Sequence, residues 1–288
     1  MTQNDFQLQK AIDFENSGNL LHAVQIYQSL LNDKVYKRNA TIRLVNIYSK
    51  LNKISAAVNI LDEYMNSNKD DYDFAKYFGH FLVTNSQFEK AIELLSEFDF
   101  DKRPEAYYLV GAAYFGLKDF ENSRINFLQL LAFSDQHELF ADAYIYLAKI
   151  NLILNNIDEA DEALEKIRKT KISNFEFYFV DAQIHFKKGM YFHAYELIRK
   201  AEKLNADSSE IALWGGRILL KMEEYQKAES YLLKSLNDAP TPEVYSMLGW
   251  VCLKNRKEKD AEDYFSKALS LEPNYKSALE GKSKLSLA

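Results

Sequence analysis

The segment PEVYSMLGWVCLKNRKEKDAEDYFSKALSLEPN, residues 242–274, carries two apolar stripes at helical spacing. The first stripe follows the pattern i, i+3, i+4 and i+7 and consists of Tyr245, Leu248, Gly249 and Cys252. The second follows i, i+4 and i+7 and consists of Ala261, Phe265 and Ala268. Residues at these intervals share one face of an α-helix, so the segment predicts two helices joined by a short turn. Thr241 and Pro242 are typical of an N-cap and of the first helical position.

The same pattern recurs along the chain at nearly constant spacing. Its eight matches start near residues 4, 38, 72, 104, 141, 175, 209 and 242. Small residues such as Gly79 and Gly111 recur where two helices must approach closely, and bulky residues such as Phe127 recur where a gap must be filled. Any single match is a weak signal, but eight together indicate a repeat architecture.

This pattern resembles that of the tetratricopeptide repeat, a unit of about 34 residues with small and aromatic residues at set positions. The resemblance covers nearly the whole chain. It implies an all-α, right-handed superhelical solenoid of about eight helix–turn–helix repeats. We therefore expect a repeat array over residues 4–274 and a C-terminal capping helix over residues 275–288, whose polar outer side closes the stack.

Two places depart from the pattern. The step from repeat four to repeat five is the longest and places extra chain at residues 134–138. Repeat two has Asn52 where glycine usually turns the chain, and it lacks the terminal proline. Either departure bends the superhelix or marks a boundary between two half-arrays, and the sequence leaves both alternatives open.

Composition limits the classes of partner. The net charge of −6 argues against a general nucleic-acid binder, which needs a basic face to displace counterions from phosphates. The N-terminal segment has no basic stretch followed by an apolar run, and no apolar run is long enough to insert into a membrane. A single cysteine excludes an intrachain disulfide. We expect a cytoplasmic protein.

In the family that the chain resembles, the first helix of each repeat lines a concave groove where partners usually bind. The resemblance places its exposed face at the second, fifth, ninth and twelfth positions of the repeat. The second position carries a predicted acidic ridge, formed by Asp73, Glu105, Asp142, Glu176, Glu210 and Glu243. Carboxylates in a first helical turn gain about 0.3–1 kcal/mol each from the helix dipole, which accounts for the pattern without a partner. Such a ridge also selects a partner with Lys or Arg, and both interpretations hold together.

The other exposed positions predict a groove with apolar anchors and a few basic residues. The candidate partner-binding residues are Lys76, His80, Tyr108, Phe115, Lys149, Phe179, Phe186, Arg217 and Trp250. Core packing accounts for part of this apolar stripe, but large apolar patches rimmed by charge often mark interaction sites. We expect the groove to take an extended or helical segment with apolar anchors and basic residues.

Known sites of other kinds have no support in the sequence. Some members of the family hold a partner's terminal carboxylate in a clamp of Lys, Asn and Arg, but here Lys76 is followed by His80 and then by Asp142 at the key positions. No zinc-binding spacing, phosphate-binding glycine loop or nucleophile motif occurs, so we expect no metal, no cofactor and no enzyme activity. Cys252 stands on a core face and is interpreted as a small hydrophobic residue.

The function predicted from the sequence is that of a non-catalytic scaffold or adaptor, which binds a peptide segment or partner protein in its concave groove. Two alternatives stay open. One is an architectural subunit that self-assembles through its outer faces or ends. The other is a chaperone for secreted or membrane proteins, which would bind many apolar segments instead of one.

Overall fold

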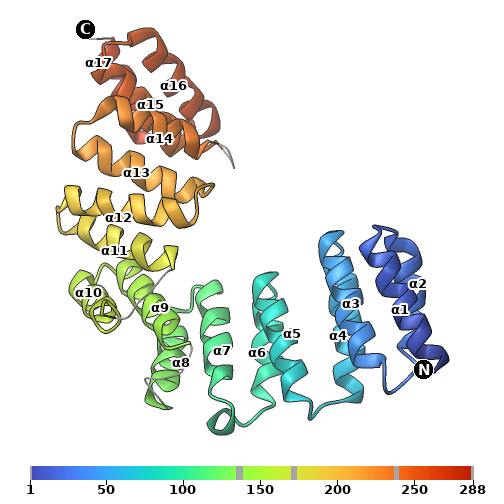
Figure 1. Cartoon of the computed structure of the whole chain (residues 1–288). Helices are drawn as coiled ribbons and strands as arrows, with labels where there is room; N and C mark the ends of the chain where they lie inside the picture. The colour runs from blue at the N-terminus through green and yellow to red at the C-terminus, as the bar shows by residue number, and fades with distance from the viewer. Residues whose placement is uncertain (1, 134–138, 170–173, 237–239, 287–288) are drawn as a thin grey trace. The chain divides into compact units, whose positions relative to one another are not determined.

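The computed structural model describes residues 2–133, 139–169, 174–236 and 240–286 (Figure 1). These residues form helices and short connections, and no strand occurs among them. The chain divides into two compact units, Met1–Asp135 and Gln136–Ala288, called here the N-terminal unit and the C-terminal unit. The extra chain predicted at residues 134–138 lies outside the described residues, and the division between the two units falls within it.

Over its described residues, 2–133, the N-terminal unit contains eight α-helices and one turn of 3₁₀-helix. In chain order these are α1 (Gln3–Asn16), α2 (Leu20–Leu30), α3 (Lys37–Lys50), α4 (Ile54–Ser67), α5 (Tyr72–Thr84), α6 (Phe88–Ser96), η1 (Phe100–Lys102), α7 (Glu105–Gly116) and α8 (Phe120–Phe133).

The C-terminal unit contains nine α-helices among its described residues. They are α9 (Phe140–Ile153), α10 (Ile157–Glu165), α11 (Phe175–Lys187), α12 (Tyr191–Leu204), α13 (Ser209–Lys221), α14 (Tyr225–Ser235), α15 (Pro242–Lys254), α16 (Glu258–Leu271) and α17 (Lys276–Leu285).

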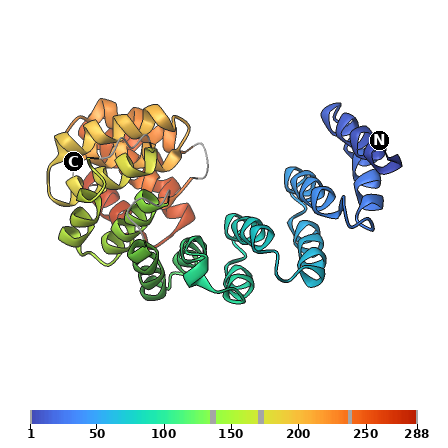
Figure 2. The same ribbon diagram turned by 60° about the horizontal axis from the view of Figure 1, so that its bottom comes forward.

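The helices are arranged as eight successive pairs. Each odd-numbered helix from α1 to α15, called here a first helix, packs most extensively against the second helix that follows it. Figures 1 and 2 show this alternation in both units. The final helix, α17, packs against both α15 and α16 and covers the end of their pair. The prediction of an all-α helical-repeat solenoid is confirmed.

The turn within every pair has the same geometry. The fifteenth residue of each repeat adopts positive φ: Gly18, Asn52, Ser86, Lys118, Asn155, Gly189, Glu223 and Arg256. The amide of the next residue then donates to the carbonyl five residues earlier in the chain, as Lys257 does to Cys252 at 2.9 Å. This is the Schellman motif, which satisfies carbonyls at a helix C-terminus and usually uses glycine. Six of the eight turns form without glycine, at a cost of roughly 1 kcal/mol or more for each left-handed residue.

The two helices of a pair approach through small residues on the first and large ones on the second. A Cβ added to Gly249 would lie 2.5 Å from the ring of Phe265, and one added to Gly216 would lie 2.6 Å from Leu232. At the equivalent place in repeat four, a Cβ on Gly111 would lie 3.1 Å from Phe127. These glycines are therefore structural spacers that bring the helix axes together.

Candidate functional site

The first helices of the C-terminal unit lie side by side. α9 contacts α11, α11 contacts α13, and α13 contacts α15, while the final helix α17 continues the row beyond α15. In the N-terminal unit, α5 and α7 are the neighbouring first helices that touch within the described residues. A continuous surface of first helices therefore exists within the C-terminal unit. We call it the first-helix surface, defined by Lys149, Glu176, Phe186, Trp214, Arg217 and Glu243.

An aromatic cluster lies at the middle of this surface. Phe186 on α11 and Trp214 on α13 pack edge to face, with ring centroids 5.5 Å apart and planes at 87°. Both side chains are partly exposed. Trp214 was not among the predicted groove residues, because it occupies the sixth position of its repeat and not the second, fifth, ninth or twelfth. Its neighbour Phe186 stands at the twelfth position, which is one of those four.

The prediction that Phe179 is an exposed anchor in the groove is corrected by its burial. Its side chain is only 7% exposed and packs with Ala182, Ile198 and other buried residues of α11 and α12. Its ring also meets the edge of Trp214 at a centroid distance of 6.4 Å. Phe179 therefore supports the aromatic cluster from beneath and does not present its own surface to a partner.

Arg217 joins the aromatic cluster to the next repeat. Its guanidinium lies 4.7 Å from the centroid of Trp214, within range of a cation–π interaction. Its Nε donates to the Glu243 carboxylate on α15 at 3.0 Å, and a terminal nitrogen pairs with the same oxygen. Arg217 is thus held between an aromatic face and a carboxylate, with its orientation set by both.

Repeats five and six contain a similar arrangement. The Lys149 ammonium lies 5.1 Å from the centroid of Tyr146 and donates to Glu176 of the next first helix at 2.9 Å. In both cases an aromatic residue stands at the sixth position, a base at the ninth, and an acid at the second position of the following repeat. In the N-terminal unit, Lys76 on α5 forms a longer pair with Glu105 on α7, at 3.7 Å.

These ion pairs change the predicted acidic ridge. Three of its six carboxylates, Glu105, Glu176 and Glu243, are paired with bases that the sequence analysis assigned to the groove. Asp73 and Glu210 are exposed. The negative charge available to steer a partner is therefore smaller than the count of carboxylates predicts. The positions of these acids and bases follow from the repeat, but their pairing joins residues 26 to 29 apart in the chain.

Asp142 on α9 has a perturbed acidity. Burial raises the pKa of its carboxyl, and repulsion by Glu176 raises it further. The side-chain amide of Asn174 at 3.3 Å and the charge of Lys149 oppose this effect without overcoming it. Asp142 is therefore a carboxylate whose charged form is disfavoured by the fold.

Trp250 is held by the final helix. Its indole N–H donates to the Ser277 hydroxyl of α17 at 2.9 Å, and the Lys284 ammonium of α17 lies 4.9 Å from its ring centroid. Its ring also packs at the edge of Phe265, 5.6 Å away. These contacts tie α17 to α15, so Trp250 helps to hold the end of the stack, and its side chain is partly exposed.

The remaining predicted anchors lie in the N-terminal unit. His80 on α5 is exposed, while Tyr108 and Phe115 on α7 are partly buried. Tyr108 packs against Phe127 of α8 with centroids 5.9 Å apart, and Phe115 packs against Phe120 at 5.7 Å. Both aromatic residues therefore contribute to the packing of their own helix pair as well as to its surface.

Potential metal ligands are scattered over the residues that the structure describes. No group of three or more His, Cys, Asp or Glu side chains there is placed to hold a metal ion. Cys252 is fully buried, and burial raises the pKa of its thiol to about 11, which leaves little thiolate at neutral pH. His185 contacts Asp181 of its own helix, at 3.2 Å from Nδ1 to the carboxylate. Across the described helices, none is long and apolar enough to cross a bilayer.

Comparison with protein families gives three matches. Two models described as tetratricopeptide repeat match residues 104–137 and 242–275, and these matches begin where the sequence analysis starts repeats four and eight. A third model, described as anaphase-promoting complex, cyclosome, subunit 3, matches residues 153–235. Comparison with curated protein sequences gives no significant match.

Several solved structures share the fold. The APC/C hetero-tetramer Cut9–Hcn1 aligns with a TM-score of 0.68 and 14% identity, over 92% of this chain and 52% of the other. PilF of Pseudomonas aeruginosa aligns with a TM-score of 0.63 and 15% identity, over 74% and 96%. YrrB, described as a TPR protein with an unusual peptide-binding site, aligns with a TM-score of 0.51 and 18% identity, over 68% and 97%.

Proposed function

Because the chain is a tetratricopeptide repeat protein, we propose that it is a non-catalytic scaffold or adaptor that binds a peptide segment of a partner protein. Repeats of this kind generally mediate protein–protein interaction. The binding site in this proposal is the first-helix surface of the C-terminal unit. The observation that carries it is the partly exposed pair of Phe186 and Trp214, set between two cross-repeat ion pairs on a continuous row of helices.

The chemistry of this surface suits a segment with one apolar anchor. Large aromatic side chains supply most of the binding energy at interfaces when they are rigidly held and rimmed by polar groups. Trp214 is supported by Phe179 and by Arg217, and Phe186 packs against Trp214. The partner's apolar residue would pack on this pair, and its basic residues would face the carboxylates of Glu210 and Asp142. YrrB, with its peptide-binding site, is in keeping with a peptide as the ligand.

Affinity capture from a lysate of the source organism tests the proposal. The intact protein is compared with a Phe186→Ala, Trp214→Ala double variant, which removes the aromatic pair. The matched control is a Phe192→Ala, Leu204→Ala double variant, because these two apolar residues of α12 are exposed on a second helix of the same unit. We expect the captured partner to be lost with the first variant and kept with the control. Capture that survives in the first variant contradicts the proposed surface.

One observation favours self-association as a second candidate function. On the outer face of α8, Ile125 and Leu128 are 48% and 47% exposed. The residues equivalent to Ile125 in the other seven repeats are all polar: Gln25, Asn59, Glu93, Glu162, Glu196, Ser230 and Asp263. Light scattering across a range of protein concentrations distinguishes the two functions. A molecular mass that grows with concentration, and no longer does so in an Ile125→Asp variant, supports self-association.

A further inference from the structure

A cleft of about 290 Å³ opens in the N-terminal unit between α4, α5 and α6. It lies at the junction between repeats two and three, where α4 meets α5. Among the junctions between successive repeats within either unit, the helices touch least extensively here. Pockets for drug-sized molecules or cofactors begin at about 300 Å³, so this cleft suits a single side chain. It is formed mainly by second helices and is separate from the first-helix surface.

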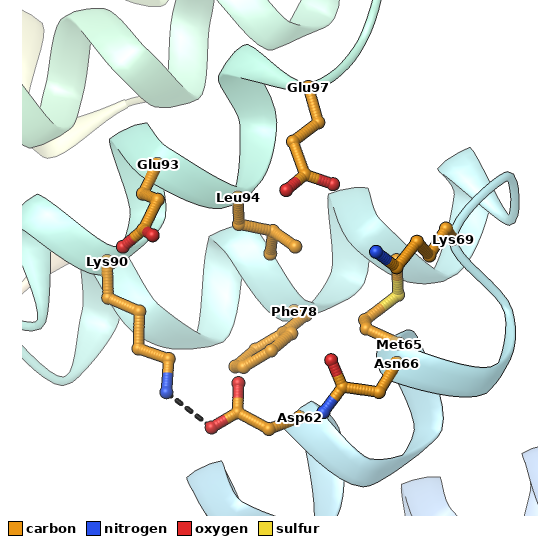
Figure 3. A pocket seen from close by; sticks show the side chains of 9 residues that line it. All are labelled: Asp62, Met65, Asn66, Lys69, Phe78, Lys90, Glu93, Leu94 and Glu97. Carbon is orange, nitrogen blue, oxygen red and sulfur yellow. Dashed lines mark hydrogen bonds and ion pairs between the residues drawn. The ribbon is translucent and has the colours of Figure 1, made fainter.

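The bottom of the cleft is apolar. Phe78 of α5 forms the floor, with Met65 of α4 on one side and Leu94 of α6 on the other (Figure 3). One end is closed by an ion pair between Lys90 of α6 and Asp62 of α4. An aliphatic chain entering here would contact carbon and sulfur atoms along its length.

The α6 side of the cleft carries two exposed carboxylates, those of Glu93 and Glu97. Glu93 and Glu97 stand one helical turn apart, on either side of Leu94 (Figure 3). Neither forms a hydrogen bond or an ion pair with a described residue, and the ammonium of Lys69 across the cleft is likewise unpaired within that part of the chain. Since Lys90 is neutralised by Asp62, the unpaired groups sum to a charge of −1. The cleft therefore favours a cation.

From this combination we infer that the cleft binds an arginine side chain from an exposed segment of a partner protein. The aliphatic stem lies along Met65 and Leu94, and the guanidinium bridges Glu93 and Glu97. Arginine fits better than lysine, because its planar fork of five N–H donors can serve two carboxylates at once. Its long apolar stem and charged end match a cleft with an apolar floor and an acidic rim.

Methionine methyl NMR on the full chain tests this inference. The chain has five methionines, so methyl-labelled protein gives few signals, and the Met65 signal is assigned by its loss in a Met65→Leu variant. The probe is N-acetyl-arginine methylamide, titrated into the millimolar range. The neutral isostere N-acetyl-citrulline methylamide serves as the comparison. We expect the arginine probe to shift the Met65 signal saturably and the citrulline probe to leave it in place.

Three variants show which groups bind the probe. A Glu93→Gln, Glu97→Gln variant should weaken binding by about tenfold or more, since both charged acceptors are lost. The control Glu89→Gln changes the same type of exposed residue on α6 outside the cleft and should bind normally. Lys69→Met removes the opposing charge and should tighten binding. Unshifted Met65, equal shifts with citrulline, or an unaffected double Gln variant would overturn the inference. The proposed function rests on other residues in the other unit, so it fails or succeeds separately.

Discussion

Replacing Gly249 by alanine tests how closely the helices of a repeat are packed. Gly249 of α15 faces the ring of Phe265 on α16, and an added Cβ would lie 2.5 Å from Cε1 and 2.6 Å from Cδ1 of that ring. The ring has little room to retreat, because Gly281 of α17 approaches it from another side and Trp250 packs at its edge. The methyl group therefore has to displace either the ring or a helix.

Two opposing effects set the size of the change. Alanine stabilises a helix interior by about 1 kcal/mol relative to glycine. Overpacking a well-filled core costs about 1–3 kcal/mol. The contact falls nearly 1 Å short of ordinary van der Waals distance, so overpacking should win, and we expect Gly249→Ala to lower the free energy of unfolding by about 1 kcal/mol.

The matched control is Gly111→Ala at the same position of repeat four. There the added Cβ would lie 3.1 Å from the tip of Phe127, so the ring needs to yield by only a few tenths of an ångström. We expect this variant to be neutral or stabilising by up to about 1 kcal/mol, because the helix propensity is gained at little steric cost.

Urea unfolding followed by circular dichroism and by tryptophan fluorescence measures both changes. Hydrogen exchange of the α15–α17 amides shows whether the loss in Gly249→Ala is local. In a Phe265→Leu background the strain should be relieved, so Gly249→Ala should lower the free energy of unfolding less. The double-mutant cycle should give an interaction free energy of about 1 kcal/mol between the two substitutions. Stabilisation by Gly249→Ala in the native background would refute the reasoning, since it would mean that helix propensity outweighs the close contact.

Three further predictions concern single groups. Gly189→Ala should lower the free energy of unfolding by about 1 kcal/mol, and Glu223→Gly should raise it by a smaller amount. Both residues adopt positive φ at the equivalent position of the turn in their own repeats, and thermal or urea unfolding measures both changes. Asp142→Asn should raise the melting temperature at pH 7, because the raised pKa of Asp142 means that folding disfavours its charge. The gain should disappear as the pH falls below the ordinary carboxyl pKa of 3.8, where Asp142 is protonated in the folded and in the unfolded state. Cys252 should resist iodoacetamide in the folded protein and react after denaturation, which mass spectrometry detects; rapid modification of the native chain would contradict its burial.

The fold was predictable because its information is local and repeated. The interval between Gly249 and Phe265 recurs as Gly111 with Phe127 and Gly216 with Leu232, and such small–large pairs specify how two helices meet. Helix periodicity places the remaining apolar residues on one face without reference to distant parts of the chain. The turns were less evident, since only Gly18 and Gly189 among the eight left-handed residues are glycines, the residue type that usually signals this conformation because it has no Cβ. At Lys118, Glu223 and Arg256 the packing of the two helices overrides the local preference.

The sequence by itself determined the repeat, its register and the face of each first helix from which a side chain projects, because these follow from 3.6 residues per turn and a short-range pattern. Only the tertiary structure decided what those side chains meet. It paired Arg217 with Glu243, buried Phe179 against Trp214, placed α17 over Trp250 and set the carboxylates of Glu93 and Glu97 beside a cleft. The physical reason is that each of these outcomes depends on the distance and rotation between neighbouring helices. That geometry is the sum of many packing contacts between repeats, and no interval along the chain encodes it.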